Sequence, residues 1–151
     1  MSENVQKLRD EIKNLALNWF QAVYDIEGLL LNANTFLSLF AKSDWDELKN
    51  ELPNWNNSEL NILASTLSGG DQDGDIIQDN FFYGYIFTLV DDSTSVFLLD
   101  DMFYFFESNI DSEELLESML LRLLTLKRNG YLTDNSYEYW VNRIEHQKAC
   151  R

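Results

Sequence analysis

One long segment of the chain carries many negative charges and no positive ones. Between Asn50 and Leu121 the sequence has no Lys or Arg, although it contains fifteen acidic residues. Because like charges repel, such a segment can fold only if its carboxylates stay in water or meet cations from elsewhere. The acidic residues are Glu51, Glu59, Asp71, Asp73, Asp75, Asp79, Asp91, Asp92, Asp100, Asp101, Glu107, Asp111, Glu113, Glu114 and Glu117.

The rest of the chain is neutral, because its eleven acidic residues are balanced by eleven basic ones. The acidic segment therefore accounts for the whole formal charge of −15. An acidic surface can serve solubility alone, or it can bind a basic partner. We favour the second interpretation, since unpaired charge costs stability. Nucleic acid and anionic membranes would be repelled, so we expect neither as a partner.

Apolar residues predict an all-α fold. Leu occurs 24 times, against eight Ile and five Val, which favours helices over sheets. The first helix is expected from a stripe at three- and four-residue steps, which either continues or breaks near Gly28. This stripe consists of Val5, Leu8, Ile12, Leu15, Trp19, Val23 and Ile26. We expect a single domain over residues 1–151, built as a compact bundle of six to eight helices.

Capping residues mark several of the later helices. Ser43 or Asp44 can cap one helix and Ser58 can cap the next. A well-marked helix spans residues 111–129 and ends at Asn129-Gly130, and a last helix starts near residue 134. The apolar residues from Ile77 to Val90, and those from Val96 onward, fit two helices, and the alternative is an α+β fold with a small hairpin around residues 82–99.

Catalytic residue combinations are missing from the sequence. The single histidine, His146, and the single cysteine, Cys150, both lie near the chain end, where no third group can hold a base in place. The acidic loop that starts at Asp71 has Ile76 and Phe82 where a calcium-binding loop needs Gly and Glu. We therefore expect no enzyme activity, no metal site and no cofactor.

A magnesium-dependent, all-α nucleotide hydrolase is the enzyme alternative. Such enzymes hold magnesium with acidic residues three or four apart on facing helices. Glu114 with Glu117 and Asp44 with Glu47 have this spacing. The same spacing is common on helix faces that simply meet water, so the alternative stays second to a binding function.

The expected compartment is the cytoplasm. The first residues are charged from Glu3 onward and contain no apolar signal core. Apolar runs stop at about five residues, whereas about twenty are needed to span a bilayer. The single cysteine also leans towards a reducing compartment.

Aromatic residues alternate with the acids in two stretches, DQDGDIIQDNFFYGY and LLDDMFYFFES. With its size and clustered Asp residues, the chain resembles the small acidic immunity proteins of bacterial contact-dependent growth inhibition and related polymorphic toxin systems. The resemblance implies a basic cognate toxin domain, a nuclease of the RNase type, whose cationic substrate cleft the protein masks. A nucleic-acid mimic and an acidic chaperone or adaptor for a basic protein remain open as alternatives.

The predicted partner-binding surface combines the acidic loop with nearby carboxylates and two aromatic anchors. Aromatic side chains surrounded by charge are typical of binding anchors. The predicted residues are Asp71, Asp73, Asp75, Asp79, Tyr83, Asp91, Asp92, Asp100, Asp101 and Tyr104.

Overall fold

The computed structural model describes residues 2–17, 26–68, 76–102, 110 and 112–150. In these residues the chain forms eight α-helices and one short 3-10 helix, and none of them lies in a β-strand. The prediction of an all-α fold with six to eight helices is confirmed. The hairpin alternative is wrong, because residues 76–99 form two helices separated by a short turn.

Contacts divide the chain into two compact units, Met1–Asp75 and Ile76–Arg151. The expectation of a single domain stays a prediction, and each unit is described by itself. Among the described residues, no helix is both long enough and apolar enough to cross a membrane.

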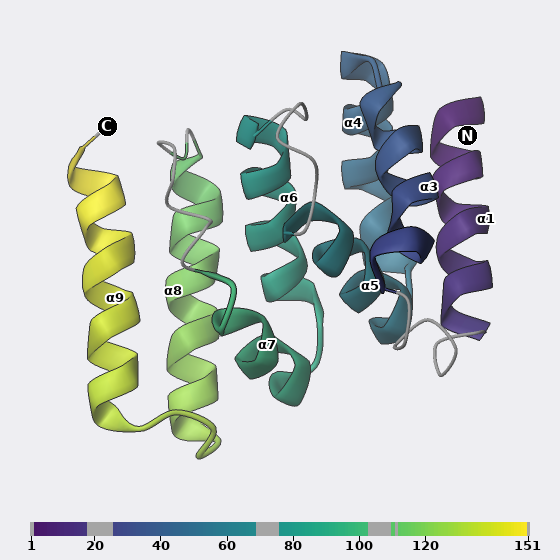
Figure 1. The fold of residues 1–151 in the computed structure, drawn as a ribbon. Helices are drawn as coiled ribbons and strands as arrows, with labels where there is room; N and C mark the ends of the chain where they lie inside the picture. The colour runs from purple at the N-terminus through teal and green to yellow at the C-terminus, as the bar shows by residue number, and fades with distance from the viewer. Residues whose placement is uncertain (1, 18–25, 69–75, 103–109, 111, 151) are drawn as a thin grey trace. The chain divides into compact units, whose positions relative to one another are not determined.

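The first unit is built around α1 (Glu3–Leu17), which contacts α3 (Ile26–Ser38), α4 (Lys42–Glu51) and α5 (Asn57–Ser68). The 3-10 helix η1 (Leu52–Asn54) follows α4 directly. The first four residues of the predicted stripe, Val5, Leu8, Ile12 and Leu15, are at most 1% exposed in α1. Of the other three, Trp19 and Val23 lie outside the described residues, and Ile26 begins α3. Figure 1 shows these helices in purple and blue.

Two local expectations for the first unit are corrected, and a third stays a prediction. Whether the first helix continues or breaks near Gly28 depends on residues 18–25, which lie outside the described residues; Gly28 itself lies inside the first turn of α3. Ala41, and not Ser43 or Asp44, is the N-cap of α4. The residue that caps α5 is Asn56, whose side chain accepts from Glu59 N (2.8 Å) while the Glu59 carboxylate accepts from Asn56 N (3.0 Å). These paired bonds form a capping box that replaces the predicted Ser58 cap.

The second unit contains α6 (Ile76–Leu89), α7 (Asp92–Leu99), α8 (Glu113–Arg128) and α9 (Asp134–Ala149). Helix α8 contacts α9 and α6, and α6 contacts α7. In Figure 1, α6 and α7 are teal, and α8 and α9 run from green to yellow. Helix α6 has apolar residues all around it, and both Phe82 and Phe87 are at most 2% exposed.

The predicted end of α8 at Asn129-Gly130 is confirmed. Gly130 has a φ of +81°, which only glycine adopts without strain. Its N–H donates to Lys127 O (3.1 Å), and Tyr131 N donates to Leu126 O (2.9 Å). This pair of bonds is the Schellman motif, which satisfies the last carbonyls of a helix.

Candidate partner-binding surface

Helix α7 has a pair of aspartates at each end, with Asp91-Asp92 at its start and Asp100-Asp101 directly after its last residue. Asp91 is the N-cap, and its carboxylate accepts from Thr94 N (2.9 Å) and from Ser93 Oγ (3.2 Å). The hydrogen bond from the Thr94 backbone is the main cause that lowers the pKa of Asp91. Asp91 is thus exposed and charged, and its role as N-cap accounts for an aspartate at this position.

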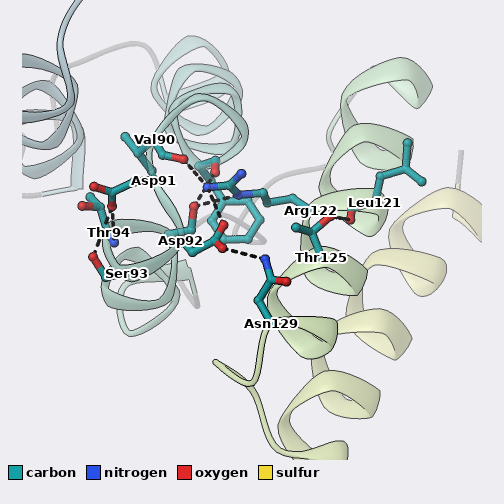
Figure 2. A network of polar contacts seen from close by, with 11 residues as sticks. Val90, Asp91, Asp92, Ser93, Thr94, Leu121, Arg122, Thr125 and Asn129 are labelled. Carbon is teal, nitrogen blue, oxygen red and sulfur yellow. Dashed lines mark hydrogen bonds and ion pairs between the residues drawn. The ribbon is translucent and has the colours of Figure 1, made fainter.

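Asp92 is neutralised inside the unit. Its carboxylate lies 3.4 Å from Arg122 Nη2 and accepts from Asn129 Nδ2 at 2.8 Å. Arg122 lies in the second half of α8, and Asn129 is the residue that follows its last turn (Figure 2). Asp92 therefore offers a partner less charge than the sequence suggests.

Asp100 and Asp101 are both exposed and lie at the negative end of the α7 dipole. A carboxylate at a helix C-terminus costs about 0.3–1 kcal/mol, because the last carbonyls repel it. Within the part of the chain that the structure describes, neither aspartate forms an ion pair with a basic side chain.

An exposed aromatic ring lies beside these charges. Phe97 is 61% exposed, whereas Leu98 and Leu99, which follow it, are buried. Residues three and four apart share a face of a helix, so Asp100 and Asp101 follow Phe97 on one face. We call Phe97, Asp100 and Asp101 the α7 surface.

Tyr83 does not belong to that surface, and its prediction as a surface anchor is wrong. Its ring is 4% exposed, and its hydroxyl donates to Leu98 O at 2.5 Å. Burial raises the pKa of the Tyr83 hydroxyl, and the charges of Asp101 and Asp100 raise it further. Tyr83 therefore lies in the core around α6, and its hydroxyl binds a carbonyl of the last turn of α7.

Phe97 was missed because the sequence alone does not say which aromatic residue faces out. A signal existed, since Val96 to Leu99 are four consecutive apolar residues in a short helix. Four consecutive residues cover every side of a helix, so one of them must point away from a one-sided core.

Four of the ten predicted residues lie at the two ends of α7, Asp91 and Asp92 at its start and Asp100 and Asp101 after its last residue. Asp79 lies in the first turn of α6 and is half-buried. The remaining three acids, Asp71, Asp73 and Asp75, and the second anchor, Tyr104, lie outside the described residues.

Basic residues that flank the acidic segment neutralise part of it. Besides Asp92, Glu51 lies 3.7 Å from Arg9 Nη1, and Glu117 lies 4.0 Å from Lys148 Nζ. The expected shortage of internal cations is thus reduced at three positions in the described chain. The α7 surface is not among those positions.

Carboxylates that could have held magnesium have other partners. Asp44 accepts from Asn4 Nδ2 (3.0 Å) and Ala41 N (2.9 Å), and Glu47 accepts from Ser2 N (2.8 and 2.7 Å). These hydrogen bonds lower the pKa of both groups. They fasten the start of α1 to α4. The described residues contain no group of three His, Cys, Asp or Glu side chains placed to bind a metal ion.

Comparisons with protein-family models, with curated proteins and with solved structures found no match to this chain.

Proposed function

We propose that this protein binds a basic protein partner through the α7 surface and acts as an immunity protein against a cationic toxin nuclease. The observation that supports the proposal most strongly is Phe97, which lies exposed beside two aspartates at the unfavourable end of a helix. A partner cation placed there would turn two repulsive charges into attractive ones.

Clustered carboxylates suit the inhibition of a nuclease, because a nuclease grips its substrate with Lys and Arg. An inhibitor that covers those cations competes directly with the nucleic acid. Electrostatic steering also speeds association, up to about 10⁸–10⁹ M⁻¹s⁻¹ at low salt. The exposed Phe97 ring favours a partner with an apolar pocket inside its basic surface over pure mimicry of a phosphate backbone.

The proposal includes a basic toxin domain encoded beside this chain's gene, and the test is a binding and protection assay with that domain. We expect wild-type protein to block RNA cleavage by that domain and to bind it faster at low salt than at high salt. Asp100→Lys with Asp101→Lys should slow association about tenfold or more at low salt. If the wild-type protein neither binds nor protects, the proposed function is wrong.

A matched control separates the position of the charges from their number. Glu138→Lys with Glu145→Lys reverses two exposed acids on α9 and gives the same net charge of −11 as the α7 variant. We expect this control to associate almost as fast as the wild type. Equal slowing by both variants would show that only net charge matters, and it would remove the α7 surface from the interface.

A further inference from the structure

Arg122 is the first basic residue after the cation-free segment, and its side chain is only 18% exposed. Its Nε donates to Ser95 Oγ at 3.0 Å, and its Nη2 donates to Val90 O. The same Nη2 lies 3.4 Å from Asp92 Oδ1. One guanidinium from α8 thus meets the end of α6, the start of α7 and the buried side of α7 (Figure 2).

The partners of Arg122 are themselves fixed. Ser95 is fully buried, and its hydroxyl donates to Phe87 O at 3.0 Å. Val90 O follows the last residue of α6, where a cation is favoured by the helix dipole. The planar guanidinium can serve all these acceptors at once, which a lysine ammonium cannot do with the same fixed geometry.

Helix α7 needs such support, because its eight residues are too few for a stable isolated helix. At its far end, the Tyr83 hydroxyl from α6 holds the carbonyl of Leu98. At its near end, Arg122 and Asn129 hold Asp92. We propose that Arg122 is a positioning residue, which fixes α7 so that Phe97, Asp100 and Asp101 are presented to the partner as one rigid surface.

For its effect on binding, the inference rests on the proposed function. A positioning role and the charge of Arg122 predict opposite changes in affinity. Arg122→Met removes a cation and makes the protein more acidic, so pure electrostatics predicts tighter binding to a basic partner. A positioning role predicts weaker binding, with an unchanged or faster association and a dissociation about tenfold faster. The sign of the change in affinity therefore decides between the two roles.

The experiment measures hydrogen exchange in the free protein and binding kinetics with the same toxin domain. We expect Arg122→Met to speed exchange of the α7 amides at least tenfold more than that of α9 amides, and to speed dissociation of the complex. Arg128→Met is the matched control, because it removes an exposed cation from the same helix and should change neither quantity beyond twofold. Tighter or unchanged binding, or equal acceleration of exchange in all helices of the unit, would overturn the inference.

A second variant covers the case in which Arg122→Met does not fold. Arg122→Lys keeps the charge but loses the planar fork, so we expect faster exchange confined to α7 and dissociation between the wild type and Arg122→Met. Exchange in Arg122→Lys that matches the wild type would overturn the inference. If the wild type binds no toxin domain, the proposed function is wrong, while the exchange pattern still decides whether Arg122 positions α7.

Discussion

Phe97 and Phe87 offer a direct test of the α7 surface, because two identical side chains in adjacent helices have opposite environments. Phe87 is fully buried, and Phe97 is 61% exposed. Full burial of such a side chain contributes about 1.5–3 kcal/mol, so the buried two-fifths of Phe97 contribute on the order of 1 kcal/mol. Replacing Phe by Ala regains about 0.5 kcal/mol of helix propensity. We expect Phe97→Ala to lower the free energy of unfolding by only about 0.5 kcal/mol.

Phe87→Ala should behave differently, because it leaves a cavity in the core around α6. Such replacements cost about 3–5 kcal/mol. Urea unfolding followed by far-ultraviolet circular dichroism measures both variants under the same conditions. A loss above about 2 kcal/mol for Phe97→Ala would mean that its ring is covered in solution. In that case the ring could not serve as a binding anchor, and the reasoning about the α7 surface would fail.

Three further predictions concern buried and charged groups. Ser95→Ala should cost about 1–3 kcal/mol in urea unfolding, because it leaves Arg122 Nε without its buried acceptor; an unchanged free energy of unfolding would contradict this role of Ser95. Tyr83→Phe should cost only about 0.5–1.5 kcal/mol in the same assay, since Leu98 O still accepts a backbone N–H; a larger loss would point to a second role of the hydroxyl. The lowered pKa of Asp44 adds stability above its ordinary value of 3.8, and this stability is lost as the pH falls through the lowered pKa. Melting temperatures of wild type and Asp44→Asn should therefore converge in acid, and a constant difference would refute the assignment.

The fold could be predicted where a local pattern decides the outcome. The stripe of Val5, Leu8 and Ile12 has one helical solution, and all three residues are buried. Asn129-Gly130 ends α8 because only glycine takes the required positive φ without strain. Helix starts were harder, since the sequence around residues 56–58 offers both Asn and Ser as caps. The choice of Asn56 depends on which side chain reaches the free N–H groups.

The candidate site depends on contacts between distant residues, which a single sequence does not contain. The aspartates at both ends of α7 were predicted from the distribution of charge. The neutralisation of Asp92 was not, because its cation, Arg122, follows thirty positions later in the chain. Tyr83 was predicted to be exposed and is buried, whereas Phe97 is exposed and was not predicted. This error also comes from contacts between residues that are distant in sequence. Packing against α6 decides which ring is buried, and both residues have aromatic neighbours in sequence.

The electrostatics of α7 link its stability to the presence of a partner. Asp91 favours the helix by capping its positive end, whereas Asp100 and Asp101 disfavour it by about 0.3–1 kcal/mol each at the negative end. In the free protein, the hydroxyl of Tyr83 offsets part of this cost by donating to a carbonyl of the last turn. Lys or Arg side chains of a partner near the two exposed aspartates would remove the repulsion and add attraction. A basic partner should therefore stabilise α7 itself, with its amides becoming more protected on binding, in addition to covering the surface that α7 presents.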